Sequence, residues 1–196
     1  MGDHVLFFYD AKERTGTLMA PQMIYRVIYG RPDPKQWQKS RLRFQPALLH
    51  GYQRHRVRDA DYPGIVPVSE AQEKDQASKS SLKTSVLGTI VYGLSDADVQ
   101  RLDQYEGSDY AHKTVWVRTL QDSQHEEDLA GSSVEKTLRH ILDAAGTESM
   151  EEGEEIEAVT YLWVSPREEL EEAEWDFEHF KREKMSWWIG ADESEW

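Results

Sequence analysis

Apolar residues follow two different spacings along the first third of the chain, and each spacing predicts a different kind of element. Residues 5–9 are apolar throughout and predict a short buried strand. A polar loop follows, and Pro21 then opens a stretch whose apolar residues recur three to four positions apart, which predicts a helix over residues 22–29. Residues 46–68 return to a strand pattern that turn residues interrupt.

The centre of the chain repeats this change of pattern. Residues 86–92 predict another strand. The next segment carries apolar residues three positions apart, and it predicts a helix that Ser95 or Asp96 caps and Gly107 ends. Residues 114–118 alternate between β-branched or aromatic and polar positions, which predicts a strand directly after that helix.

Polar and acidic stretches separate or follow these elements. Residues 69–85 are poor in apolar residues and predict a surface loop, and residues 121–155 form an acidic insertion. Residues 156–164 predict the clearest strand of the second half. Residues 166–190 then place bulky apolar residues at helical spacing and predict a C-terminal helix that packs on the core. We therefore expect one domain over residues 1–190.

Strands follow one another more often than they alternate with helices. This order favours an α+β fold, with a small mixed or closed β-barrel and flanking helices, over a doubly wound parallel sheet. The sequence shows no internal repeat of roughly 20 to 50 residues. It also lacks the glycine-rich patterns that hold nucleotide phosphates, so we expect no nucleotide cofactor.

Composition narrows the classes of function. The 196 residues carry a formal net charge of −14, which opposes sequence-independent binding to nucleic-acid phosphates. The sequence contains no cysteine, which excludes disulfides, thiolate metal sites and cysteine nucleophiles. It also lacks a signal-peptide pattern and any run approaching the roughly 18 apolar residues of a membrane span. We expect a cytoplasmic monomer or dimer that binds neither nucleic acid nor membrane and needs no cofactor.

Glu106 is the strongest candidate for chemistry. It lies between the predicted helix and the following strand, where a turn can direct a side chain into a cavity. The alternative is a solvated carboxylate near a helix C-terminus. Such a charge opposes the helix dipole, so the position offers it no stabilisation.

Two loops are further candidates, and each has a simpler interpretation. Residues 16–21 lie before a helix N-terminus, where backbone N–H groups and the helix dipole favour a ligand carboxylate. Tyr62, Pro63 and Gly64 form a rigid turn whose glycine admits close approach of another group. Ordinary turn formation would explain both segments equally well.

Three other groups of residues are weaker candidates. The seven histidines show no spacing typical of a metal site, so we expect no metal. The basic residues between His50 and Arg58 alternate along a strand, which predicts a solvated face or pairing with the abundant acids. The aromatic residues near the C-terminus are more typical of a core than of a ligand cage.

A series of short motifs gives the chain a family resemblance. In chain order they are F-F-Y, G-T-L-M, L-L-H-G-Y, Y-P-G-I, V-L-G-T-I-V-Y-G-L, L-D-Q-Y-E-G-S-D-Y and Y-L-W-V. Together they resemble the gamma-glutamylcyclotransferase-like superfamily, in particular its plant and fungal branch of avirulence-induced proteins. The resemblance covers residues 5–120 and 156–190. It implies a small β-barrel with a cavity at one end and the acid of the Y-E-G motif, here Glu106, inside that cavity.

The resemblance implies an acyltransferase reaction without a cofactor. A gamma-glutamyl amide or peptide closes to 5-oxoproline and releases its amine. Glu106 would take the proton of the α-amino group that attacks the γ-carbonyl, and would return it to the leaving amine. The substrate-binding residues that the resemblance implies are Tyr9, Gly16, Thr17, Leu18, Met19, Tyr62, Gly64 and Tyr110.

The chain departs from the family in its first loop. Residues 10–15 stand between Tyr9 and Gly16, where the family joins a tyrosine directly to a glycine. Six residues reach about 20 Å, so this loop can move Gly16 away from the site, bulge back towards it, or cover it. Two other functions therefore stay open: a non-catalytic small-molecule-binding module, and a proton-transfer isomerase or epimerase that uses the same cavity.

Overall fold

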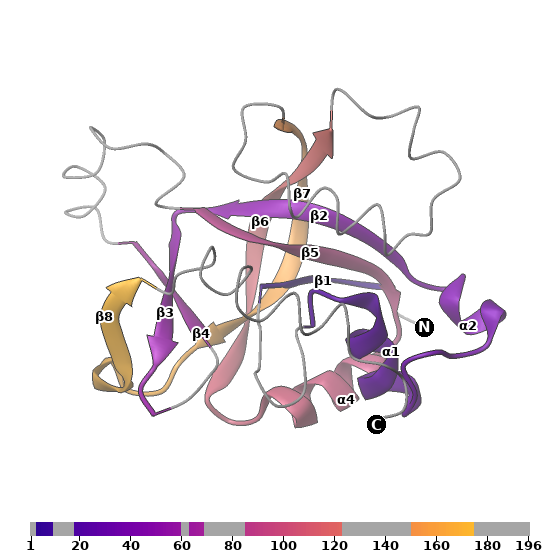
Figure 1. Ribbon diagram of the computed structural model, residues 1–196, viewed down its shortest axis with the longest axis horizontal. Helices are drawn as coiled ribbons and strands as arrows, with labels where there is room; N and C mark the ends of the chain where they lie inside the picture. The colour runs from indigo at the N-terminus through magenta and orange to yellow at the C-terminus, as the bar shows by residue number, and fades with distance from the viewer. Residues whose placement is uncertain (1–2, 10–17, 60–62, 69–84, 123–149, 175–196) are drawn as a thin grey trace, which may run out of the picture.

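The computed structural model describes residues 3–9, 18–59, 63–68, 85–122 and 150–174 of the chain. Within this part, five strands close into a barrel in the order β1-β5-β2-β6-β7. They are β1 (His4–Phe8), β2 (Arg43–His50), β5 (Ser85–Leu94), β6 (Tyr110–Asp122) and β7 (Met150–Trp163). Neighbouring strands pair antiparallel except β1 and β7, whose parallel pairing closes the barrel (Figure 1). The predicted α+β fold with a small barrel is confirmed.

A second sheet of three strands, in the order β4-β3-β8, lies beside the barrel (Figure 1). β3 (Tyr52–Val57) follows β2 through Gly51, whose φ of 76° suits a glycine. It pairs antiparallel with both β4 (Pro63–Pro67) and β8 (Leu170–Glu174). The chain therefore uses one short turn to pass from the barrel to a separate sheet.

The prediction of a turn at Pro63 and Gly64 is wrong, because both residues begin β4. Proline cannot donate to a strand ladder, and it is tolerated in edge strands and at first strand positions. Pro63 meets both conditions, since β4 lies at the edge of its sheet. Turn-forming residue types are thus compatible with a strand at this position.

The prediction of a helix over residues 166–190 is wrong where the structure describes it. A 3-10 turn, η2 (Arg167–Glu169), leads directly into β8, and the remainder of the predicted helix lies outside the described residues. Leu170 is buried and pairs with Val57 of β3. This pairing outweighs the helical preference of the neighbouring glutamates, because tertiary contacts commonly override intrinsic propensity.

The acidic insertion over residues 121–155 is also shorter than predicted. Gln121 pairs with Glu151 and Asp122 with Met150, so both ends of the predicted insertion belong to strands β6 and β7. Exposed glutamates on β7 hide the strand pattern, because few of these positions are apolar. The middle of the insertion, like the predicted loop over residues 69–84, lies outside the described residues.

Two of the three predicted helices are present, as α1 (Pro21–Tyr29) and α4 (Asp96–Glu106), and they contact each other at one end of the barrel (Figure 1). The short helix α2 (Gln36–Lys39) buries none of its residues, so no apolar spacing reveals it in the sequence. None of the described helices has both the length and the apolar character needed to cross a lipid bilayer.

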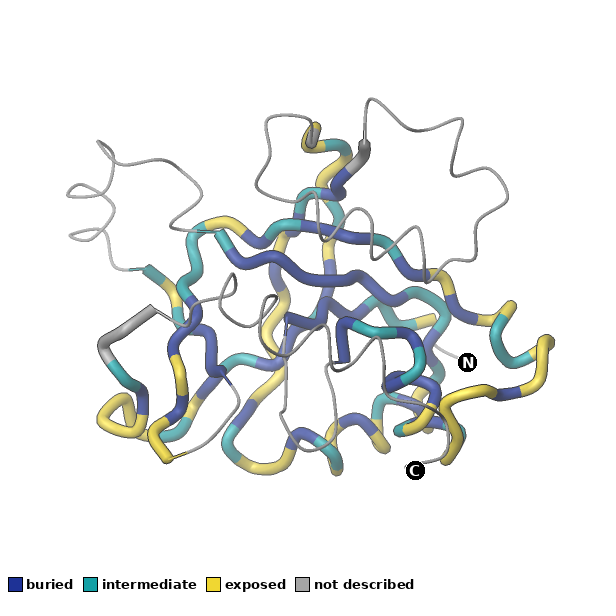
Figure 2. Tube along the Cα trace, in the orientation of Figure 1, coloured by how far each residue is buried: buried dark blue, intermediate teal, exposed yellow. Residues whose placement is uncertain are grey.

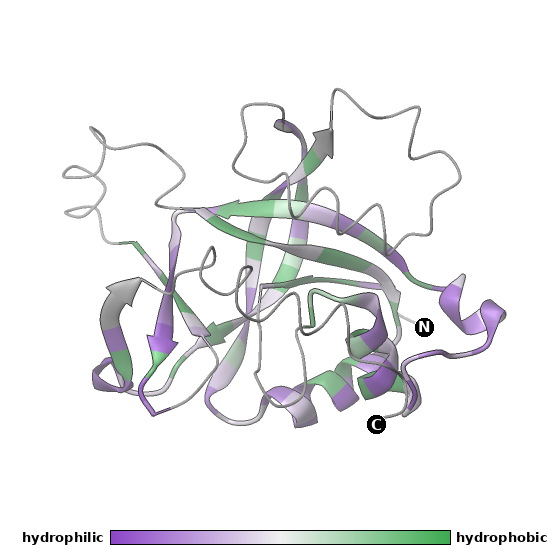
Figure 3. Cartoon of the chain, in the orientation of Figure 1, coloured by the Kyte–Doolittle hydropathy of each residue, from purple (hydrophilic) through white to green (hydrophobic). Residues whose placement is uncertain are grey.

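Alternate residues of the strands supply two hydrophobic clusters. Phe7 belongs to one cluster, and its neighbours Leu6 and Phe8 belong to the other, because successive side chains of a strand point to opposite faces. Buried positions run along β1 and β5 in Figure 2, and the same strands are predominantly apolar in Figure 3. The cluster that contains Phe8 also includes Tyr161 and Trp163 of β7, together with residues of α1 and α4.

Candidate active site

Helix α4 places Glu106 at the end of the barrel. Ser95 caps the helix by accepting a hydrogen bond from the backbone N–H of Asp98, whose carboxylate accepts in return from the backbone N–H of Ser95. Gly107 ends the helix with a φ of 85°. Glu106 is therefore the last helical residue, and only 6% of it is exposed. The alternative of a solvated carboxylate is wrong.

Tyr161 of β7 lies next to this end of the helix. Its hydroxyl donates a hydrogen bond to Oδ1 of Asp103 at 2.7 Å. Asp103 and Glu106 are three residues apart and therefore lie on the same face of α4. Burial raises the pKa of Tyr161 above its ordinary value, and the hydrogen bond to Asp103 and the charges of Asp103 and Glu106 raise it further. The Tyr161 hydroxyl is thus held neutral beside two carboxylates.

A histidine continues this polar cluster towards the surface. His112 Nε2 lies 2.7 Å from Asp103 Oδ1, the same oxygen that accepts from Tyr161. His112 also faces Tyr161 across the β6–β7 pairing, with the ring centroids 5.0 Å apart. The cluster therefore extends from buried Tyr161 to the partly exposed side chains of Asp103 and His112.

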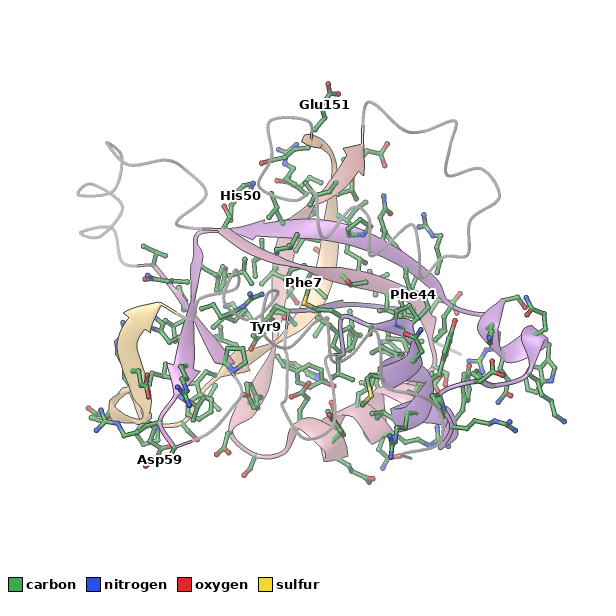
Figure 4. The ribbon with its side chains drawn as sticks, in the orientation of Figure 1. Phe7, Tyr9, Phe44, His50, Asp59 and Glu151 are labelled. Atoms are coloured by element: carbon green, nitrogen blue, oxygen red, sulfur yellow. The ribbon has the colours of Figure 1, made fainter. Side chains whose placement is uncertain are left out.

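Tyr9 follows β1 and reaches the same part of β7. Its hydroxyl donates to the backbone carbonyl of Tyr161 at 2.6 Å, and the residue is 2% exposed. Figure 4 shows Tyr9 near the centre of the molecule, where the chain leaves β1. The predicted substrate-binding tyrosine is therefore tied to the strand that carries Tyr161.

Arg54 fixes the backbone at Tyr9. Its Nη2 donates to the carbonyl of Tyr9 at 2.9 Å and to the carbonyl of Leu87 at 2.7 Å. Arg54 is buried, so the prediction that the basic residues of this strand form a solvated face is wrong for it. An arginine that binds backbone carbonyls cannot be recognised from charge alternation alone.

Gly64, Tyr110 and Trp163 form an aromatic wall. A Cβ atom on Gly64 would lie 2.9 Å from Cβ of Trp163, so only glycine allows this close approach. The rings of Tyr110 and Trp163 meet edge to face with centroids 5.5 Å apart, and the Tyr110 hydroxyl donates to the carbonyl of Pro63 at 3.2 Å. Gly64 and Tyr110, which the sequence predicts as site residues, are therefore brought together by Trp163.

Leu18 and Met19 lie just before α1, and both are buried in the core cluster that contains Tyr161 and Trp163. The carbonyl of Met19 accepts a hydrogen bond from Oγ1 of Thr89 at 3.2 Å. The other predicted site residues, Gly16, Thr17 and Tyr62, lie outside the described residues. In the described ranges, no three His, Asp or Glu side chains are grouped as metal ligands.

The sequence matches a known family over most of these elements. A family profile described as gamma-glutamyl cyclotransferase, AIG2-like, matches residues 7–131. The chain belongs to this family. The matched residues include the end of β1, strands β2 to β6 and helix α4 with Glu106, so the resemblance read from the sequence motifs is confirmed.

Two relatives agree with this assignment to the AIG2-like family, and one solved structure is similar in fold. Protein AIG2 C of Arabidopsis thaliana is 28% identical over 136 residues, which cover 69% of this chain and 56% of that protein. Protein AIG2 B of Arabidopsis thaliana is 29% identical over 146 residues, which cover 74% and 61% respectively. The chain thus spans less than two thirds of either relative. The solution structure of At3g28950.1 from Arabidopsis thaliana is similar in fold, with a TM-score of 0.56 at 22% identity, covering 96% of this chain and 79% of that one.

The sequence did not predict a role for Tyr161, Trp163 or Asp103, which the structure places on β7 and α4. Tyr161 and Trp163 belong to the quoted motif Y-L-W-V, and their spacing of two places them on one face of β7. That spacing was the available signal for both residues. Asp103 stands three positions before Glu106, but its contact with His112 and Tyr161 depends on how β6 and β7 pack against the helix.

Proposed function

We propose that this AIG2-like protein is a gamma-glutamylcyclotransferase that converts a gamma-glutamyl amide or peptide into 5-oxoproline and a free amine. The observation that carries the proposal is the burial of Glu106 in the Y-E-G motif at the end of α4. Membership of the family supports the class of substrate. The reaction needs no cofactor, and we place it in the cytoplasm.

The chemistry requires one group that both accepts and donates a proton. The α-ammonium nitrogen of the glutamyl part loses one proton to Glu106, attacks the γ-carbonyl carbon four bonds along the chain, and loses a second proton as the five-membered ring closes. A C–N bond forms, the original amide C–N bond breaks, and the two protons pass through Glu106 to the leaving nitrogen, which departs as an ammonium group. No water is consumed, and the two products contain all atoms of the substrate.

The charges around Glu106 suit the positive α-ammonium group of such a substrate. Asp103 shares the helix face of Glu106, and the Tyr161 hydroxyl donates a hydrogen bond to Asp103. The tyrosine oxygen therefore offers only acceptor positions to a further group. In this proposal, Tyr9, Gly64 and Tyr110 form the walls, and the loop of Gly16, Thr17, Leu18 and Met19 holds the α-carboxylate with Tyr62 opposite.

The test is release of 5-oxoproline from a panel of gamma-glutamyl amides, measured for the wild type and for Glu106→Gln. Wild-type release that falls on the order of 10²- to 10⁴-fold in Glu106→Gln supports general acid–base catalysis. Glu168→Gln neutralises an exposed carboxylate in η2 and serves as the matched control, which retains full activity.

The interrupted loop between Tyr9 and Gly16 supports one rival function, a binding module that has lost substrate orientation. A folded wild type that binds members of the panel without releasing 5-oxoproline would favour this module. Conversion of a bound compound into an isomer, lost in Glu106→Gln, would instead indicate a proton-transfer enzyme.

A further inference from the structure

Trp163 carries a buried hydrogen-bond donor for which the described residues supply no acceptor. The residue is 5% exposed, and its indole Nε1 has no hydrogen-bond partner in the part of the chain that the structure describes. Buried tryptophan N–H groups normally find a partner, because a desolvated donor without one costs free energy. The position of this donor therefore calls for an acceptor from another molecule.

Packing prevents the indole from turning to another acceptor. Tyr110 meets the ring edge to face, and the backbone of Gly64 touches its base so closely that no side chain fits there. The Tyr110 hydroxyl is itself used by the carbonyl of Pro63. The N–H direction is thus set by the fold before any ligand binds.

The donor is connected to the helix end that carries Glu106 through both of its strand neighbours, Tyr161 and Tyr110. Trp163 and Tyr161 lie on the same face of β7, about 7 Å apart along the strand. The hydroxyl of Tyr161 is hydrogen-bonded to Asp103 of α4, and the charge of Glu106 helps to raise the pKa of Tyr161. Trp163 pairs with Tyr110, which begins β6 directly after the turn that follows Glu106.

We propose that the Trp163 indole N–H donates a hydrogen bond to the γ-carbonyl oxygen of the substrate, so that Trp163 is a second catalytic residue of the site. This inference rests on the proposed cyclotransferase function. When the amine attacks the carbonyl carbon, the oxygen gains negative charge and the hydrogen bond strengthens. The indole keeps its proton throughout, and the proton transfers remain those of Glu106.

The surroundings favour a carbonyl oxygen over the substrate carboxylate as the acceptor. A single neutral N–H among aromatic rings satisfies a carbonyl, whereas a buried carboxylate needs several donors or a cation. Asp103 and Glu106 already place two carboxylates on the adjoining helix face, and they repel a third. The carboxylate therefore binds elsewhere.

The first test compares Trp163→Phe with Trp116→Phe, which changes a 58% exposed tryptophan on β6. We expect Trp163→Phe to lower kcat on the order of 10²-fold. KM changes by less than about threefold, because the hydrogen bond matters most in the transition state. Trp116→Phe behaves as the wild type. A folded Trp163→Phe with unchanged kcat, or with a raised KM alone, overturns the inference while the proposed function stands.

The second test needs no Trp163 variant. Glu106→Gln is titrated with glutamate γ-ethylamide, and the indole ¹H–¹⁵N signals are followed, with Trp163 assigned through ring contacts to Tyr110. A downfield shift of the Trp163 proton on binding, with Trp116 unmoved, supports the hydrogen bond. Binding seen at other signals without a Trp163 shift overturns the inference. A wild type that binds and cleaves no gamma-glutamyl compound overturns both proposals.

Discussion

Helix α4 buries one carboxylate near each of its ends, and the surroundings of the two charges differ. Asp98 in the first turn is 2% exposed, and Glu106 at the last position is 6% exposed. Burial alone therefore does not separate them. Their positions along the helix and their neighbours do.

Asp98 is held by several donors. Its Oδ2 accepts from the hydroxyl of Ser95 at 2.6 Å and from the backbone N–H of Ser95 at 2.9 Å. Arg41 and Arg101 approach its two carboxylate oxygens at 3.2 and 3.4 Å. The helix dipole also favours a negative charge at this end. The contacts of Asp98 fully explain its burial as a structural feature.

Glu106 occupies the opposite end, where the helix dipole opposes a negative charge. It lies near the neutral hydroxyl of Tyr161, whose pKa its charge helps to raise. The dipole interaction of a carboxylate at this position is unfavourable, and a glutamine would not have it. Comparison of the two ends therefore teaches that the acid to test for chemistry is the one at the helix end where the dipole opposes its charge.

The largest expected difference concerns the rate. Glu106→Gln removes the proposed base and lowers 5-oxoproline release on the order of 10²- to 10⁴-fold. The same substitution relieves an unfavourable dipole interaction, so the free energy of unfolding stays the same or rises by up to about 1 kcal/mol. Both quantities come from one preparation, by product assay and urea denaturation. A large loss of stability with a retained rate would make Glu106 a structural acid like Asp98.

The next expected effect is on stability at the other end of α4. Asp98→Ala removes the acceptor for Ser95 and two arginines, and we expect the free energy of unfolding to fall by about 1–3 kcal/mol. The rate per folded molecule stays unchanged. Asp96→Ala, at an exposed first-turn acid, is the control and costs less than about 1 kcal/mol. Equal losses in the two variants would show that dipole position, and not the donors around Asp98, sets the stability.

Asp103 connects the Glu106 end of the helix to Tyr161, and its substitution is expected to have a smaller effect. Asp103→Asn replaces the charged acceptor of the Tyr161 hydroxyl, and we expect the rate to fall about tenfold. Stability changes little because Asp103 is partly exposed. Asp109→Asn is the control, since Asp109 binds the hydroxyl of Ser165 instead. If Asp103→Asn reacts at the wild-type rate, the hydrogen bond between Asp103 and Tyr161 does not help to bind the substrate ammonium group.

The sequence predicts the ends of α4 well because local signals specify them. Ser95 and Gly107 are typical cap residues, and the apolar spacing between them marks a helix. It also predicts the strands of the barrel, whose apolar positions alternate or run together. β8 and the ends of the acidic insertion are mispredicted, because their strand character comes from pairing with β3 and between β6 and β7.

The residues of the candidate site also fall into those that local sequence specifies and those that depend on tertiary contacts. Glu106 stands out in the sequence because its motif and its helix terminus are local features. Arg54 and Asp103 do not stand out, because their roles arise from contacts with β1, β5, β6 and β7. A buried arginine that binds carbonyls and a solvated one have the same local sequence signature. Only the packed structure distinguishes them.

The smallest expected effect is an alkaline change in stability at the Glu106 end. The pKa of Tyr161 lies above its ordinary value of 10.0, chiefly through burial, so the folded protein keeps this proton when the unfolded chain has lost it. The stabilisation is fully present below about pH 10 and is lost as pH rises further, by up to about 1.4 kcal/mol per pH unit. We expect Tyr161→Phe to show a shallower decline than the wild type in urea unfolding between about pH 9 and 11. Tyr92→Phe, at a less buried barrel tyrosine whose pKa burial also raises, is expected to reduce the slope less. Equal slopes for wild type and Tyr161→Phe would mean that the Tyr161 hydroxyl ionises as freely in the folded protein as in the unfolded chain, and so is not held neutral between α4 and β7.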